Sequence, residues 1–253
     1  MSKPKNKIIS IVCAAVTALF LFVESSCFIA ISSRAISSRI RGNGTPKTER
    51  LSHSNFDAVS IGGDWTVDIR YSEIFSVTIV ADENLFSYLD IYVSDKTLHI
   101  GFQRGYTIDR ARCKAFITMP SLTQLTASGS LTGTISSFNM HRKTLSIDVS
   151  GSGDITAQGI IVDTLKLKLS GSGSFTASGE AEHMIAAISG SGDIKTTRLE
   201  AETADISISG SGSAKVWVTR LLTADISGSG SIGYKGNPTI IRRISGSGSV
   251  YAL

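Results

Sequence analysis

Cysteine and histidine are both scarce in this sequence, and their positions exclude several kinds of site. Of three cysteines, Cys13 and Cys27 lie near the N-terminus, so Cys113 is the only one in the body of the chain. A disulfide within that body is therefore excluded. The four histidines are scattered, at His53, His99, His141 and His183. Without a pair at ligand spacing, neither a metal site nor a Ser-His-Asp triad is predicted, and no cofactor is expected.

An excess of positive charge is also missing from the body of the chain. Residues 1–50 hold eight Lys or Arg and two acidic residues, whereas residues 51–253 hold 17 and 19. A domain that binds nucleic acid should be net-positive, so nucleic acid is disfavoured as a partner. Only four prolines occur, and 42% of the 253 residues are hydrophobic. This composition excludes general disorder and is enough for one sizeable β domain with a core.

Residues 1–31 are predicted to be a signal peptide or membrane anchor. Three lysines precede an apolar run over residues 8–23, as in a secretory signal. Ser25-Ser26-Cys27 resembles the end of a bacterial lipoprotein signal, in which Cys27 is lipidated, although Glu24 stands where an aliphatic residue is usual. Cleavage by the ordinary signal peptidase and an uncleaved anchor are the alternatives. All three export the body of the chain to the periplasm, outer membrane or cell surface of a bacterium.

Residues 32–54 are rich in Ser, Arg, Gly and Thr without apolar periodicity, and are predicted to be a flexible linker. Beyond residue 55, alternating apolar residues predict strands at 56–61, 65–71, 75–81, 91–94 and 98–102. Gly62-Gly63-Asp64 is expected to be a turn between the first two strands. Residues 82–89 predict one helical turn capped by Asp82. Residues 101–114 are basic and predict a projecting loop.

The C-terminal half repeats the tetrapeptide Ser-Gly-Ser-Gly. Six copies begin at Ser150, Ser170, Ser189, Ser209, Ser227 and Ser245, with spacings of 20, 19, 20, 18 and 18 residues. A period of this length indicates stacked structural turns, each with two or three sides. The predicted fold is an all-β parallel β-helix, a solenoid, over 55–253. Its first coils, 55–114, form an irregular N-terminal β cap, and 115–253 form the regular turns.

The frame of the repeat predicts which side chains face the core. The residue before the first serine and the residue five after it are apolar in nearly every copy, as in Val149 and Ile155 or Leu169 and Phe175. Period-two alternation places these residues and both glycines on one face and the serines on the other. The glycines mark either a narrow interior or a corner. The last strand leaves an exposed edge, which needs cover from a partner or a solvated, twisted last turn.

Stacking would align the serines into two exposed rows, which we call the serine ladder. The ladder comprises Ser150, Ser170, Ser189, Ser209, Ser227, Ser245 and Ser152, Ser172, Ser191, Ser211, Ser229, Ser247. A third row, Asp154, Ser174, Asp193, Ser213, Ser231 and Ser249, flanks it. A hydroxyl array can hydrogen-bond extended glycans or another chain, accept O-linked modification, or simply be solvated. Regular stacking alone accounts for the pattern.

Three further segments carry a family resemblance. They are Asn-Phe-Asp-Ala-Val-Ser-Ile-Gly-Gly at 55–63, Val-Thr-Ile-Val-Ala-Asp-Glu-Asn-Leu at 77–85 and Ser-Asp-Lys-Thr-Leu-His-Ile at 94–100, followed by the Ser-Gly-Ser-Gly copies. In this order, residues 50–253 resemble the putative auto-transporter adhesin family with a head GIN domain. The resemblance implies a right-handed parallel β-helix on an exported, often lipid-anchored envelope protein, and it brings no catalytic residues.

The favoured function is a non-enzymatic, adhesin-like interaction module of the cell envelope that binds glycans or surface proteins through its long face. The alternative is an envelope polysaccharide-processing enzyme of the β-helix type. Such chemistry needs convergent carboxylates, and Asp154 and Asp193 would lie roughly 9.6 Å apart along the stack. Ser174 intervenes, and no Arg or His cluster accompanies them. A calcium repeat would need Asp on successive turns, so calcium is not predicted either.

Two other features suggest contacts. The basic stretch with Arg104, Arg110, Arg112 and Lys114 could touch anionic envelope polymers, or it is a solvated loop. Trp65 is expected to pack in the cap. Trp217, between two valines, is the better candidate for a surface aromatic.

Cell fractionation tests the export prediction. The chain should be found in the envelope or outside the cell. If Cys27 is lipidated, Cys27→Ser should release the protein from membranes, whereas unchanged membrane retention would favour an uncleaved anchor.

Overall fold

The computed structural model describes residues 38–253, so the predicted export signal, Cys27 and the first part of the predicted linker lie outside the described residues. These residues form seventeen strands and one 3-10 helix. The elements are β1 (Ser38–Arg41), β2 (Pro46–Leu51), β3 (Ala58–Tyr71), β4 (Ser76–Asp82), η1 (Glu83–Tyr88), β5 (Leu89–Ser94), β6 (Thr97–Phe102), β7 (Tyr106–Asp109), β8 (Cys113–Met119), β9 (Gln124–Ser136), β10 (Asn139–Gly151), β11 (Asp154–Gly171), β12 (Ser174–Gly190), β13 (Asp193–Gly210), β14 (Ser213–Gly228), β15 (Ser231–Lys235), β16 (Thr239–Gly246) and β17 (Ser249–Ala252). No helix within residues 38–253 is long and apolar enough to cross a membrane.

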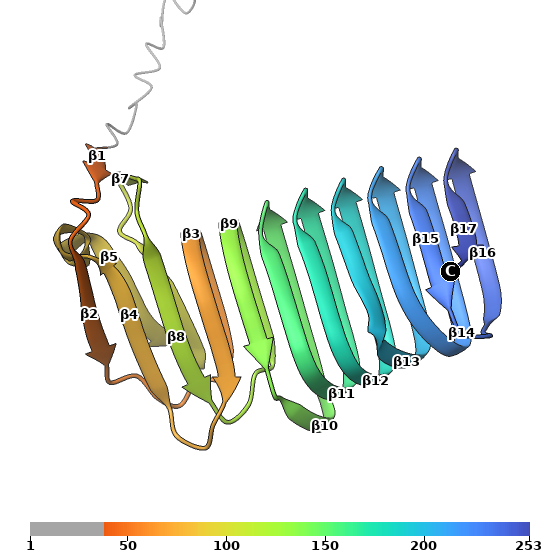
Figure 1. Cartoon of the computed structure of the whole chain (residues 1–253), viewed down its shortest axis with the longest axis horizontal. Helices are drawn as coiled ribbons and strands as arrows, with labels where there is room; N and C mark the ends of the chain where they lie inside the picture. Colours follow the sequence, from red (N-terminus) through yellow and green to blue (C-terminus); the bar gives the residue numbers. More distant parts are fainter. Residues whose placement is uncertain (1–37) are drawn as a thin grey trace, which may run out of the picture. The chain divides into compact units, whose positions relative to one another are not determined.

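The C-terminal strands stack in parallel as a β-solenoid of about six turns (Figure 1). Each Ser-Gly-Ser-Gly copy pairs with the next in register, so that Ser150 lies opposite Ser170 and Ser209 opposite Ser227. The same register holds for the intervening and final copies. The prediction of an all-β parallel solenoid with stacked repeats is therefore confirmed.

Each full turn has three straight segments, as the pairing of β12 with β13 shows. Residues 174–176 pair with 193–195, residues 178–181 with 198–201, and residues 183–190 with 203–210. The pairing is interrupted between these segments, and in β13 the alternation of buried and exposed residues changes phase at both interruptions. These interruptions are the second and third corners, and the Ser-Gly-Ser-Gly segment is the first.

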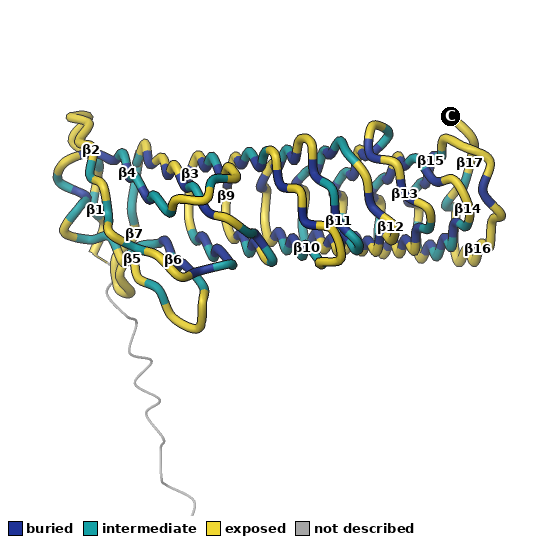
Figure 2. The backbone as a smooth tube through the Cα atoms, turned by 90° about the horizontal axis from the view of Figure 1, so that it is seen from below, coloured by how far each residue is buried: buried dark blue, intermediate teal, exposed yellow. Residues whose placement is uncertain are grey.

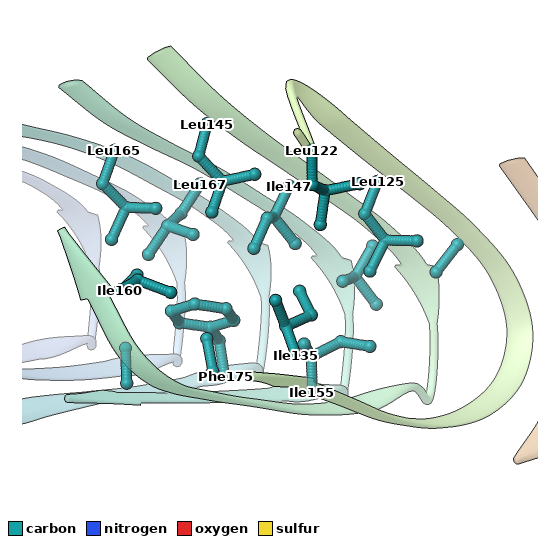
Figure 3. Packing of buried hydrophobic residues seen from close by; sticks show 14 of the residues in the cluster. Leu122, Leu125, Ile135, Leu145, Ile147, Ile155, Ile160, Leu165, Leu167 and Phe175 are labelled. Carbon is teal, nitrogen blue, oxygen red and sulfur yellow. The ribbon is translucent and has the colours of Figure 1, made fainter. Parts of the chain in front are cut away.

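The core is a set of apolar columns that run along the stack. Leu145 and Ile147 of one turn lie next to Leu165 and Leu167 of the following turn, and side chains such as Phe175 point toward them from the opposite side (Figure 3). Each of these five side chains is at most 3% exposed. No single turn could bury this surface alone, so the stacking itself supplies the hydrophobic stabilisation.

The two glycines of the repeat have different roles, although both were predicted to face inward. The second glycine, as in Gly173, is buried inside the turn. The first, as in Gly171, lies at the corner with a φ of +121°, in a region that favours glycine. The serines between and before them are mostly exposed, as predicted, and buried and exposed positions alternate along the tube in Figure 2.

The stacking order departs from the chain order at β3. Residues 58–70 of β3 pair in parallel with β9 along their whole length, and Gly63 lies opposite Gly129. The φ of Gly63 is +111°, close to those of the repeat glycines. Gly62-Gly63-Asp64, predicted as a turn between two strands, is thus a solenoid corner within one strand. β6 and β8 pair with the two halves of β3 on its other side.

Antiparallel strands close the N-terminal end of the stack. β4 pairs with β8, β2 with β4, and β5 with β6. The linker prediction is therefore wrong for residues 46–51, because these polar residues form an edge strand, and for residues 38–41, because β1 pairs with β7. That pairing also corrects the loop prediction, since β7 lies within residues 101–114. An edge strand with one side in solvent does not need alternating apolar residues, so these strands could not be recognised from the sequence.

The predicted helical turn is the 3-10 helix η1, but Asp82 does not cap it. The Asp82 side chain makes no capping hydrogen bond. Its carboxylate, 4% exposed, instead accepts a hydrogen bond from the Gly44 backbone N–H at 3.2 Å. Asp82 therefore ties the segment between β1 and β2 to the cap.

The outermost turn at the other end, formed by β16 and β17, is exposed within the chain. Ile240 and Ile244 are 37% and 40% exposed, although they stand in the columns of the buried Leu222 and Ile226. Arg242 stands in the column of the buried Ala224. A charged residue at such a position discourages pairing of the edge with another strand.

Substitution at Gly171 tests the glycine corner. A Cβ there would collide with the backbone carbonyl of Gly151, on a φ that L side chains rarely adopt. Overpacking of this kind costs about 1–3 kcal/mol. The exposed neighbour Ser172 is the matched control, and Ser172→Ala should change stability by no more than roughly 0.5 kcal/mol. In thermal unfolding, Gly171→Val should lower Tm clearly more than Ser172→Ala, and the reverse order would mean that the serines support the fold.

Candidate functional site

The serine ladder is continuous over six turns of the stack. Its first row occupies the ends of β10 to β14 and β16, and its second row lies in the corners that follow these strands. Every serine of the ladder is exposed except Ser170, which is half-buried. Parallel pairing spaces the residues of a row by roughly 4.8 Å.

The backbone at the ladder is satisfied without the serine hydroxyls. The N–H of Ser172 donates to the Gly151 carbonyl at 3.0 Å, and the N–H of Ser191 donates to the Gly171 carbonyl at 2.9 Å. Within residues 38–253, none of the twelve ladder hydroxyls forms a side-chain hydrogen bond. Apart from the half-buried Ser170, the ladder side chains are exposed to solvent.

The flanking row pairs its carboxylates with serines of the next turn. Ser174 Oγ donates to Asp154 Oδ1 at 2.5 Å, and Ser213 Oγ donates to Asp193 Oδ1 at 2.5 Å. Neither carboxylate forms a salt bridge within residues 38–253.

An acidic concavity of about 340 Å³ lies on another side of the stack. Its lining includes His141, Glu180, Glu182, Glu200 and Glu202. Glu180 pairs with Glu200 in adjacent strands, and Glu202 lies 3.8 Å from Arg220. The 20-residue spacing of these glutamates was a signal in the sequence that the prediction did not use. No group of metal-ligating side chains in the described region is placed to hold an ion.

The two tryptophans differ in environment. Trp65 is buried in the cap, as predicted, at 2% exposure. Trp217 is half-buried, and the ammonium group of Lys235 lies 3.7 Å from the centre of its ring. This cation–π contact covers one face of the indole, so Trp217 is only partly the surface aromatic that the sequence predicted.

Cys113 is a core residue rather than a nucleophile. Its side chain is 3% exposed at the start of β8. Burial raises the pKa of the Cys113 thiol to about 12, and the nearby carboxylates of Asp82 and Asp64 act in the same direction. A thiol with so high a pKa holds almost no thiolate at neutral pH.

The fold and the repeated exposed rows define an all-β solenoid protein with a serine-rich corner. The family model "Putative auto-transporter adhesin, head GIN domain" matches residues 55–238, and the chain belongs to this family. No curated protein matches the sequence.

Several solved structures share the fold. A putative adhesin from Parabacteroides merdae is 25% identical, with a TM-score of 0.69 over 86% of this chain and 100% of the other. A putative lipid binding protein from Parabacteroides distasonis is 29% identical, with a TM-score of 0.69 over 85% and 100%. A putative adhesin from Bacteroides fragilis, at 22% identity and a TM-score of 0.75 over 85% and 100%, is similar in fold alone.

Thiol labelling tests both the burial of Cys113 and the exposure of the ladder. In a full-length chain with Cys13→Ser and Cys27→Ser, a maleimide at pH 8 should leave Cys113 unmodified until guanidinium unfolds the protein. Adding Ser172→Cys in the same background should give one rapidly labelled thiol in the native state. Rapid native labelling without Ser172→Cys would contradict the buried position of Cys113.

Proposed function

We propose that this chain is a non-enzymatic, exported interaction module of the bacterial cell envelope that binds an extended glycan along the serine ladder. The observation that carries the proposal is the set of twelve ladder hydroxyls, aligned over six turns and without side-chain hydrogen bonds in the described residues. The adhesin description of the family supports a binding role.

The chemistry of the ladder suits a polymer that is itself rich in hydroxyls. Each serine offers one donor and two acceptor positions, and its hydroxyl rotates to match the partner. Single contacts of this kind contribute little, about 0.5–1.5 kcal/mol each. Many equal contacts in two straight rows would add up only for a partner that is extended and regular. An envelope glycan has both properties, and an extended segment of a surface protein is the other outcome that a binding test can reveal.

The domain would act in the bacterial cell envelope and without catalysis. The N-terminal segment would direct the domain to the envelope, as its lysines and apolar run predict. The solenoid would wind in the right-handed sense that the family resemblance implies. No catalytic role is assigned to Asp154 or Asp193, because each carboxylate is bonded to a serine of the same row.

Binding of the full-length chain to an array of capsular polysaccharides, lipopolysaccharide and peptidoglycan fragments tests the proposal. Combined Ser172→Ala, Ser191→Ala and Ser211→Ala should weaken binding at least about tenfold, since three contacts of about 0.5–1.5 kcal/mol are lost. The matched control replaces Ser52, Ser54 and Ser87, which are exposed and lie outside the repeat turns.

Both triple variants should retain the Tm of the parent, because exposed serines contribute little to stability. Equal binding by the ladder variant and the parent would show that the ladder is only solvated. Binding to an envelope protein in place of every glycan would assign the other partner class.

A further inference from the structure

The N-terminal cap contains a pocket of about 380 Å³ that no repeat residue forms. We call it the cap pocket. It lies between the corner of β3, the end of β6, and β7 with the segment that leads to β8. Its lining includes Gly62, Gly63, Asp64, Phe102, Tyr106 and Arg110. This volume is at the small end of the range for ligand sites, about 300–1,000 Å³.

A buried hydrogen-bond donor without a partner borders the cap pocket. Trp65 is 2% exposed, and in residues 38–253 its indole Nε1 meets no hydrogen-bond acceptor. Gly63 lines the cap pocket and lies next to this indole, because a Cβ built on Gly63 would be 3.6 Å from Nε1 and 3.8 Å from Phe102 Cδ2. An unpaired buried donor costs about 1–3 kcal/mol.

Aromatic rings provide the apolar part of the cap pocket. The rings of Trp65 and Phe102 are 5.8 Å apart, and Tyr106 packs edge-on against Tyr88 at 4.8 Å. Tyr106 is 38% exposed, so part of its ring is available. Aromatic walls around a few fixed polar groups are the usual composition of a small-molecule site.

Arg110, which lines the cap pocket, belongs to a group of charged side chains at the end of β7. Arg39 forms an ion pair with Asp109 at 2.6 Å. The pKa of Asp109 lies below its usual value, first because of the hydrogen bond from Arg39 and also because of the nearby charges of Arg110 and Arg41. Three guanidinium groups thus surround one carboxylate, and within residues 38–253 neither Arg41 nor Arg110 forms a salt bridge. A second carboxylate, from a ligand, would balance this charge in the bidentate geometry that arginine favours.

We propose that the cap pocket binds one acidic sugar residue, a uronate. Its carboxylate would pair with Arg110, and its ring would pack against Tyr106 and against Phe102, whose own ring lies next to the indole of Trp65. The carboxylate of Asp64 would accept a hydrogen bond from a sugar hydroxyl. This site goes beyond the proposed function and does not depend on it, since the cap pocket contains no serine of the ladder.

NMR of the ¹⁵N-labelled full-length chain with methyl glucuronide tests the proposal directly. The chain has two tryptophans, so two indole N–H signals are expected, and Trp65→Phe identifies the signal of Trp65. Methyl glucuronide should shift the Trp65 signal in a saturable way and leave the Trp217 signal in place. Methyl glucoside, which lacks the carboxylate, should bind at least about tenfold more weakly, as loss of a charge-assisted contact predicts.

Single substitutions test whether Arg110 supplies the contact with the carboxylate. Arg110→Gln should reduce the affinity for methyl glucuronide to that for methyl glucoside, whereas Arg198→Gln, an exposed control on β13, should leave it unchanged. The triple serine variant should bind methyl glucuronide like the parent, which separates this test from that of the ladder. A static Trp65 signal, equal affinity for the two sugars, or loss of binding in the serine variant would each overturn the proposal.

Discussion

The close approach of one glycine corner to the next is the contact on which the whole solenoid depends. The N–H that follows each corner glycine donates to the carbonyl of the corner glycine one turn earlier, as in Ser191 to Gly171 at 2.9 Å and Ser211 to Gly190 at 2.9 Å. A Cβ at Gly190 would lie 2.7 Å from the Gly171 carbonyl oxygen, so only glycine permits the bond. The glycines are thus required by the neighbouring turn as much as by their own. Because the backbone bonds occupy the corner, the serine side chains are left outside and unpaired.

The corner also explains how turns of different length keep their serines aligned. The repeat spacing varies between 18 and 20 residues, yet every ladder serine faces its counterpart. The extra residues are absorbed at the other corners, where the pairing shifts between Ala157 and Ile160 and between Thr176 and Ser178. Variation in length is therefore confined to the sides that lie away from the ladder. Two straight rows of hydroxyls follow from this arrangement, whatever partner they bind.

Local periodicity made the regular turns predictable from the sequence, whereas the cap strands that lack such periodicity could not be predicted. The inward columns of Val149 and Ile155 and the outward serines follow from period two within one segment, so the sequence alone places them. The Gly62-Gly63 corner has the composition of an ordinary turn, and only its stacking on Gly129 distinguishes it. β1, β2 and β7 pair with strands far along the chain and have one side in solvent. Their sequences therefore show no alternation of apolar and polar residues from which a strand could be predicted. The cap pocket likewise requires residues 62–64 and 101–111 to meet, which no spacing in the sequence indicates.

The ends of the described stack differ, and the difference bears on where a partner can lie. At the cap, the outermost strands β2 and β5 are antiparallel, and β2 carries a salt bridge between Lys47 and Glu49 at 2.6 Å. At the opposite end, Arg242 replaces an apolar residue in a core column. Both devices disfavour the addition of a further strand. The long sides are then the surfaces available to a partner.

The first row of the serine ladder leads toward the cap pocket. This row begins at Ser245 and continues through Ser150 and Ser128 to Gly62, at the rim of the cap pocket. If both proposals hold, a polymer bound along the serine ladder would be directed toward the cap pocket, where Arg110 would receive the acidic residue.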